Sequence, residues 1–188
     1  GLSSDASADG NTVAGDNNAL SASAVGTNSL AQVDGNELNG NNNTGTATAT
    51  GNFSAATVNN NEVTGNDNTA SASSTGLSSD ASADGNTVAG DNNSLSSSAI
   101  GANSRAQVDG NELNGNNNTG TTLALGDTSE ATINNNDVTG NDNSVGVTSS
   151  GLSSDASADD NSVGGEDNAL TALAAGIESD AHIDANEV

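Results

Sequence analysis

Carboxylates are the groups in this chain with the widest scope for chemistry, since it has 25 acidic residues against one basic side chain and one histidine. Catalysis by a carboxylate pair needs a cleft and a shifted pKa. Two recurring sets of acidic residues instead lie at positions whose side chains are expected to point outward, because side chains alternate between the two faces of a strand. This pattern predicts a solvated acidic surface. These sets are Asp5, Asp80 and Asp155, and Glu37, Glu62, Glu112, Asp137 and Glu187.

No nucleophile and histidine recur together, because His182 is the only histidine. A catalytic triad therefore has no basis in the sequence, and we expect that the protein is not an enzyme. We expect no resident cofactor.

Calcium is a stronger option, because Asp, Asn and Glu near turns supply the hard oxygen ligands that this ion takes. The best local pairs are Asp34 with Glu37, Asp109 with Glu112, and Asp184 with Glu187. The nine-residue calcium-roll repeat is absent, however, and the acidic positions change from one repeat to the next. Diffuse screening by cations is favoured over built-in sites, and specific calcium binding stays an alternative.

Hydroxyl side chains suggest a third chemistry, because Thr46, Thr48 and Thr50 form an outward row on a predicted strand. Flat threonine arrays on β-solenoids resemble the ice-binding faces of antifreeze proteins. Leucines at the equivalent outward positions of later repeats (Leu123, Leu125, Leu173) break the array and suggest a contact surface instead. Ice binding is kept as a lesser alternative.

All these residues lie on a 25-residue repeat that needs no insertion or deletion. The first seven units are complete and the eighth stops at Val188; the units begin at Gly1, Gly26, Gly51, Gly76, Gly101, Gly126, Gly151 and Gly176. Gly at position 1, Ser at 4, Ala at 6 and Asn at 11 occur in every unit, and Gly at 15 and Asn at 18 in all complete ones. Low hydrophobicity and high charge alone also fit disorder, but a disordered chain has no reason to keep this register.

A slower period of 75 residues lies over the first. Units 1, 4 and 7 begin with the same nine residues, GLSSDASAD, at Gly1, Gly76 and Gly151. This indicates duplication of a block of three units.

Apolar and invariant positions alternate within each unit, which is the period of a strand with one buried face. Strands are expected at about positions 18–25, 3–8 and 11–14, with Gly, Asn and Asp at the corners, where positive φ is tolerated. The sequence therefore predicts an all-β fold: one parallel β-solenoid over residues 1–188, of about 7.5 coils with three short strands each. At the parallel-strand spacing it would be a thin rod about 36 Å long.

Each residue would then stack on its counterpart in the neighbouring coil. The invariant Asn side chains are expected at inner corners, hydrogen-bonded along the axis, and the invariant Ser and Ala inside a narrow core. The asparagine columns are Asn11, Asn36, Asn61, Asn86, Asn111, Asn136, Asn161 and Asn186, and Asn18, Asn43, Asn68, Asn93, Asn118, Asn143 and Asn168. The small-residue columns begin with Ser4, Ser29 and Ser54 and with Ala6, Ala31 and Ala56.

Such asparagine columns resemble the ladders of right-handed parallel β-helices. Runs such as Asn28-Ser29-Leu30-Ala31-Gln32 also resemble curli-type subunits and bacterial adhesin repeats, although glutamine occurs only at Gln32 and Gln107. The resemblance implies a right-handed solenoid in an extracellular or cell-surface fibre.

Composition limits the partners. One arginine, Arg105, gives no electrostatic basis for nucleic-acid binding, and no apolar run is long enough for membrane insertion. Soluble solenoids usually end in atypical caps, and neither end shows one. We therefore expect an excerpt of a longer solenoid or copies that stack end to end, with the protein itself as partner. The expected function is a structural subunit of an extracellular filament; the alternative is an adhesin stalk.

Overall fold

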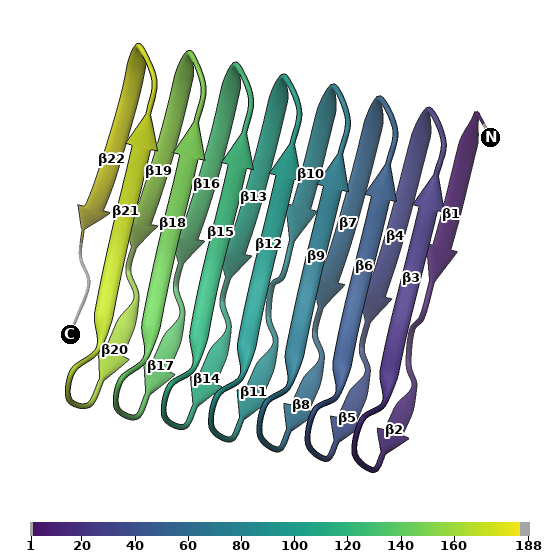
Figure 1. The fold of residues 1–188 in the computed structure, drawn as a ribbon, viewed down its shortest axis with the longest axis vertical. Helices are drawn as coiled ribbons and strands as arrows, with labels where there is room; N and C mark the ends of the chain where they lie inside the picture. Colours follow the sequence, from purple (N-terminus) through teal and green to yellow (C-terminus); the bar gives the residue numbers. More distant parts are fainter. Residues whose placement is uncertain (1, 185–188) are drawn as a thin grey trace.

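The computed structural model describes residues 2–184 as a parallel β-solenoid of about seven coils (Figure 1). Gly1, Asn186, Glu187 and Val188, which are named above, lie outside the described residues. Each coil contributes one strand to each of three parallel sheets, here called sheets A, B and C. The predicted fold class, the 25-residue coil and the three strands per coil are confirmed.

Sheet A has eight strands: β1 (Ser3–Ser7), β4 (Asn28–Asp34), β7 (Phe53–Asn59), β10 (Ser78–Ser82), β13 (Asn103–Asp109), β16 (Thr128–Asn134), β19 (Ser153–Asp159) and β22 (Glu178–Asp184). Sheet B has seven: β2 (Thr12–Ala14), β5 (Glu37–Asn39), β8 (Glu62–Thr64), β11 (Thr87–Ala89), β14 (Glu112–Asn114), β17 (Asp137–Thr139) and β20 (Ser162–Gly164). Sheet C also has seven: β3 (Ala19–Val25), β6 (Thr44–Thr50), β9 (Thr69–Thr75), β12 (Ser94–Ile100), β15 (Thr119–Leu125), β18 (Ser144–Ser150) and β21 (Ala169–Ala175).

Neighbouring coils pair in one constant register. Ser4 lies beside Ser29 and Ala6 beside Ala31, and every other strand pair keeps the same offset of 25 residues. A constant register stacks identical positions into columns parallel to the solenoid axis. All the strands lie within one residue of the expected ranges, and β1 and β10 end two residues before the other strands of sheet A.

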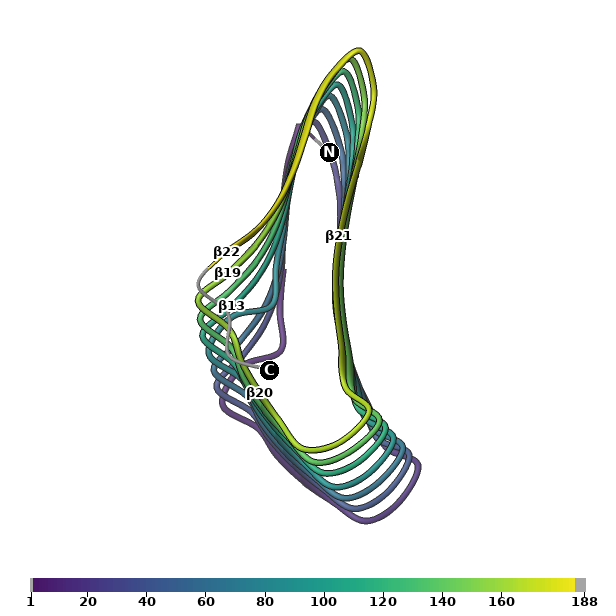
Figure 2. The ribbon, with the colours of Figure 1, turned by 90° about the vertical axis from the view of Figure 1, so that its left-hand side faces the viewer.

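The coil is flattened. Seen end-on, sheets A and C run side by side and sheet B closes one edge (Figure 2). The longest axis of the molecule follows the strands, and the coils stack across it (Figure 1). The expected thin rod is therefore wrong in its proportions, because the molecule is longest along its strands and not along the stack of coils (Figure 1).

The core is one layer of small side chains between sheets A and C, with larger ones near sheet B. Ala31, Ala56 and their counterparts are fully buried, while Val and Leu fill the wider region, as at Val33 and Leu38. Alternation buries every second residue of a strand, as the pattern in β6 shows. This alternation reproduces the period-two pattern of the sequence.

Glycine is required at two corners for different reasons. At position 15, Gly115 has φ +134 and a Cβ there would lie 2.1 Å from the carbonyl oxygen of Gly90. At position 1, Gly101 does not have positive φ, and the expectation of a left-handed corner is wrong there. A Cβ on Gly101 would instead lie 1.6 Å from the carbonyl oxygen of Gly76, so the close approach of successive coils excludes any side chain.

Candidate functional site: the Asx ladders and the outer faces

The asparagines of position 11 form a continuous inner ladder. Asn61 donates from its backbone N–H and from Nδ2 to Oδ1 of Asn86, at 3.0 and 2.9 Å. Asn86 bonds to Asn111 in the same way, at 2.8 and 3.0 Å. Nδ2 of Asn86 also donates to the carbonyl oxygen of Val58, 2.9 Å away in the preceding coil. Each amide therefore satisfies a corner of the backbone and joins neighbouring coils, as the sequence analysis predicted.

The column at position 18 is simpler. The backbone N–H of Asn68 donates to Oδ1 of Asn93 at 2.8 Å, and that of Asn93 to Asn118 at 2.8 Å. Within residues 2–184, the Nδ2 atoms of Asn43, Asn68, Asn93, Asn118, Asn143 and Asn168 are buried without an acceptor. These amides support the chain mainly as acceptors, and they stay neutral where a carboxylate would be a buried charge.

Two outer columns, at positions 9 and 16, were not predicted. The backbone N–H of Asp91 donates to Oδ1 of Asn66, and that of Asn116 donates to Oδ1 of Asp91, both at 2.7 Å. At position 9, the N–H of Asp109 donates to Oδ1 of Asp84 at 3.0 Å. Because only an acceptor oxygen is used, either Asp or Asn can accept this hydrogen bond. That mixture hides the columns from a search for identical residues, although Asp or Asn at both positions in nearly every coil was a usable signal.

The serine column at position 4 does not form a ladder along the axis. Ser54 and Ser129 bond instead across the core, to Ser74 and Ser149 at 2.8 Å, where position 24 is also serine. Within the described part of the chain, Oγ of Ser4, Ser29, Ser79, Ser104 and Ser179 has no partner. The alanines of position 6 are fully buried in the central coils, from Ala31 to Ala156. Small size is what both columns share, and it allows the two sheets to approach closely.

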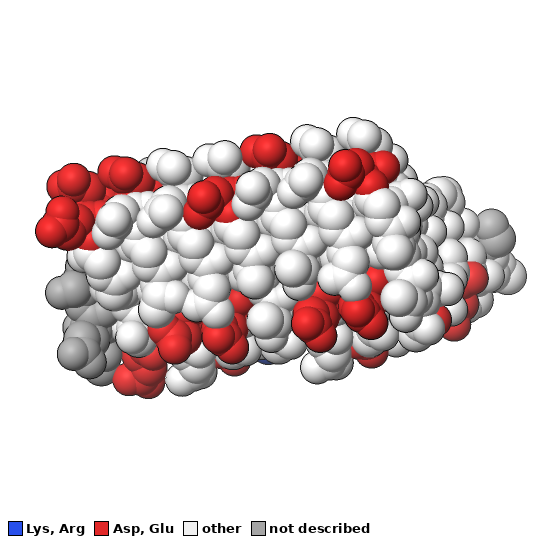
Figure 3. Space-filling model, turned by 90° about the horizontal axis from the view of Figure 1, so that it is seen from below, with Lys and Arg blue, Asp and Glu red and all other residues white. Residues whose placement is uncertain are grey.

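The carboxylates occupy the outer surfaces of sheets A and B and the corners beside them. Asp5, Asp80 and Asp155 are exposed on sheet A, and Glu37, Glu62, Glu112 and Asp137 are exposed on sheet B, as predicted. The edge that contains sheet B carries acidic side chains in two rows along the solenoid (Figure 3).

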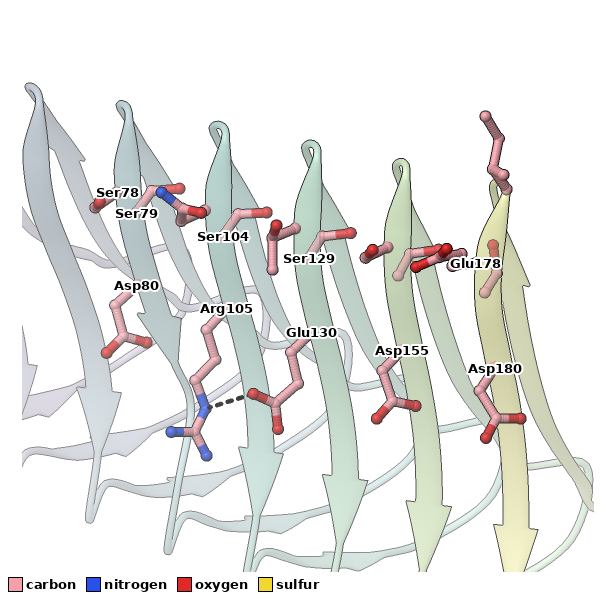
Figure 4. Close-up of a pocket in the computed structure, with 16 residues that line it drawn as sticks. Ser78, Ser79, Asp80, Ser104, Arg105, Ser129, Glu130, Asp155, Glu178 and Asp180 are labelled. Carbon is pink, nitrogen blue, oxygen red and sulfur yellow. Dashed lines mark ion pairs between the residues drawn. The ribbon is translucent and has the colours of Figure 1, made fainter.

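A shallow groove of about 960 Å³ follows the outer face of sheet A from β10 to β22. Asp80, Arg105, Glu130, Asp155 and Asp180 project into it from successive strands (Figure 4). Arg105 lies 3.9 Å from Glu130, and both side chains are about half exposed, so their ion pair contributes little. The groove is open along its length and holds no nucleophile–base pair.

Two carboxyl groups of the fourth coil have raised pKa values. Partial burial raises the pKa of Asp80, and the nearby Arg105 offsets part of the rise. Burial raises the pKa of Asp84 to about 6. The hydrogen bond from the N–H of Asp109 works against that rise, while the negative charge of Asp109 adds to it.

No cluster of three or more His, Asp or Glu side chains that could hold a metal occurs among residues 2–184. Asp34 and Asp109 instead contribute to the column at position 9, where Oδ1 of Asp34 accepts from Asn60 at 2.9 Å. Glu187 lies outside the described residues. His182 lies 3.5 Å from Asp184 and 3.8 Å from Asp159, in the last described coil.

Sheet C differs from the other faces because its seven strands contain no charged residue. Its outward side chains are mostly Ser and Thr, including the predicted row of Thr46, Thr48 and Thr50. Val25, Ile100 and Leu173 project from the same face and are 42–65% exposed. In the end view this side of the coil is straight, whereas the opposite side is bent (Figure 2).

The described residues include no helix of the length and hydropathy that crossing a membrane requires. Comparison with protein families, curated proteins and solved structures found no match to this chain.

Proposed function

We propose that the protein is a structural segment of an extracellular filament, in which β-solenoid coils stack end to end. The observation that supports this most directly is the unbroken register: Asn11 to Asn161 form one hydrogen-bonded column through the seven complete coils. Such a column gives each coil the same contacts on both sides, so the architecture extends by repetition.

The edges of sheet A provide the means of extension. Within the described residues, β1 and β22 each pair with a strand on one side only. An unpaired strand edge is a template for another strand. A further coil, from an adjoining segment or from a second copy, would continue the register already present.

The chemistry of the surface fits a structural role. Exposed carboxylates on sheets A and B keep the assembly soluble, and the open groove offers no enclosed site for a substrate. The extracellular setting rests on the resemblance to fibre and adhesin repeats. A stalk that carries an adhesive domain would use the same stacked coils, and calcium would then act as a stabilising ion.

Proline at the exposed edge tests the proposal. Asp5 is exposed on β1, at an odd position of the coil. The N–H of Asn28, also at an odd position of its coil, bonds back toward Leu2, so the N–H of Asp5 points to the free edge. Asp5→Pro removes that donor, whereas the control Asp5→Ala keeps it.

We expect filaments of wild type and Asp5→Ala in electron micrographs, with a repeat of about 4.8 Å along the axis in fibre diffraction. Asp5→Pro should give short particles with an unchanged circular dichroism spectrum. A wild-type chain that stays monomeric at millimolar concentration would contradict the proposal.

A further inference from the structure

Sheet C is the face on which the distribution of charge is most uneven. The chain has 25 acidic residues and a formal net charge of −24. None of these residues lies in β3, β6, β9, β12, β15, β18 or β21. Every coil carries acidic residues outside sheet C, at positions that change from coil to coil, so the uncharged face extends over the length of the described solenoid.

We infer that sheet C is a lateral interface through which two copies of this chain pack face to face. This inference rests on the proposed filament and adds to it a second, parallel contact. The occupant that fits is another sheet C, because both surfaces are uncharged and of the same extent.

Charge favours this face over the other two. Contact through sheet A or B would bring rows of carboxylates against each other, such as the row that contains Asp80, Glu130 and Asp155. Packed sheets lie about 10 Å apart, so acids on the far face of one copy would be about 20 Å from the partner's nearest sheet. That is about two Debye lengths at 0.1 M salt. Pairing through sheet C therefore keeps the carboxylates on the far faces of the two copies well apart.

The area is sufficient for a specific interface. Strands of seven residues are roughly 23 Å long, and seven strands span about 34 Å. The face therefore covers nearly 800 Å² on each copy, and a pair would bury about 1,600 Å², which is typical of stable protein interfaces.

Sheet C exposes large apolar side chains that contact with a second copy would bury. Val25 is 65% exposed, Leu173 is 59% exposed and Ile100 is 42% exposed. Large apolar side chains on an otherwise polar surface often mark a contact with another protein. They interrupt the regular hydroxyl array that a crystalline ligand such as ice would need, whereas a second protein sheet can interdigitate with them.

Charge placed on the face provides the test. Ser96 and Ser98 point outward from β12 in the central coil of sheet C. Ser78 and Ser82 point outward from β10 of sheet A in the same coil and are similarly exposed. The double variant Ser96→Asp with Ser98→Asp is compared with the matched control Ser78→Asp with Ser82→Asp.

Filament width in cryo-electron micrographs reports lateral pairing, and filament length reports end-to-end stacking. We expect paired solenoids joined through sheet C for wild type and for the sheet A control. The sheet C variant should give single-width filaments of unchanged length, with a pairing constant at least ten-fold weaker, because apposed like charges cost more than about 1.4 kcal/mol.

A complementary variant, Ser96→Lys with Ser98→Lys, distinguishes loss of pairing through charge repulsion from loss of pairing through misfolding. Mixed in equal amounts, the Asp and Lys variants should pair again, which a misfolded chain could not do. Failure of the mixture to pair would overturn the inference.

Three other results would also overturn it: single-width wild-type filaments, pairing that only the sheet A control disrupts, or unpaired wild-type protein that shapes growing ice. The first leaves the filament proposal intact. Short paired particles would instead support the interface and contradict end-to-end stacking.

Discussion

Val33 and Gly45 face each other across the core of the second coil. A Cβ placed on Gly45 would lie 3.8 Å from Cγ1 of Val33. The two residues occupy positions 8 and 20, where a larger residue is combined with a smaller one in every complete coil except the sixth, which has Ile133 and Val145. Where position 8 is alanine, as at Ala83, position 20 is leucine, as at Leu95. The Ala–Leu pair recurs in every third coil, at the 75-residue period of the sequence.

Truncation of Leu95 should be rescued from the opposite sheet. Leu95 and Ala83 are both fully buried. Leu95→Ala should lower the free energy of unfolding by about 2–5 kcal/mol, because it leaves a cavity. Adding Ala83→Val creates the pair present in coil 3, Val58 with Ala70, and should recover at least half of the loss. Urea unfolding of the single and double variants measures the coupling, and strictly additive effects would show that the two positions do not share the space.

Two glycines of one coil should respond to alanine in opposite ways. Gly120 has open space around a Cβ and no positive φ, so Gly120→Ala should stabilise the protein by about 0.5–1 kcal/mol. Gly115 has φ +134, and its Cβ would overlap the carbonyl oxygen of Gly90. Gly115→Ala should therefore cost several times as much as the other change gains. Thermal unfolding of both variants measures the difference, and equal effects would contradict the tight corner.

Contacts between equivalent residues of neighbouring coils could be predicted from the sequence more fully than contacts between different strands of one coil. Identical residues 25 apart reveal vertical stacking directly, which is why the inner asparagine column of Asn61 and Asn86 was predicted with its hydrogen bonds. The pairing of Val33 with Gly45 joins two different strands of one coil. Reading the repeat by columns does not detect such a pairing, although the combination of alanine at position 8 with leucine at position 20 in coils 1, 4 and 7 was present in the sequence.

The reasons for conserved residues were harder to predict than the conservation itself. Glycine at position 1 suggested a left-handed corner, but Gly101 is required because its neighbour Gly76 lies so close. The flattened coil was also missed, because strand lengths alone do not determine the angle between sheets. The columns of Asp91 and Asp84 were missed because an acceptor oxygen can come from either Asp or Asn.

Inner and outer ladder positions should differ in their tolerance of aspartate. Asn86 is buried, and its Nδ2 donates to Asn111 and Val58. Asn86→Asp removes these donors and buries a charge, so it should cost about 3 kcal/mol or more at pH 7. Asn66 is exposed and contributes only Oδ1, so Asn66→Asp should change stability by less than about 0.5 kcal/mol. Denaturant midpoints compare the two, and similar losses would refute the distinction between the ladders.

Asp84 should make stability fall as the pH rises. Burial raises its pKa to about 6 in the folded protein, from an ordinary value of 3.8. The folded state therefore binds the proton more tightly than the unfolded state. The contribution of Asp84 to the free energy of unfolding is greatest below about pH 4 and is lost as the pH rises to about 6.

Asparagine occupies the same position in other coils, at Asn59 and Asn134, where Oδ1 accepts the same backbone hydrogen bond. Asp84→Asn should therefore keep the ladder and remove the cost of a partly buried charge. Because Asp84 is only partly buried, we expect a gain of about 1 kcal/mol at pH 7.5, and none at pH 4. Urea unfolding of the wild type and the variant at both pH values measures this difference. An equal gain at pH 4 and pH 7.5 would show that titration of Asp84 is not its cause.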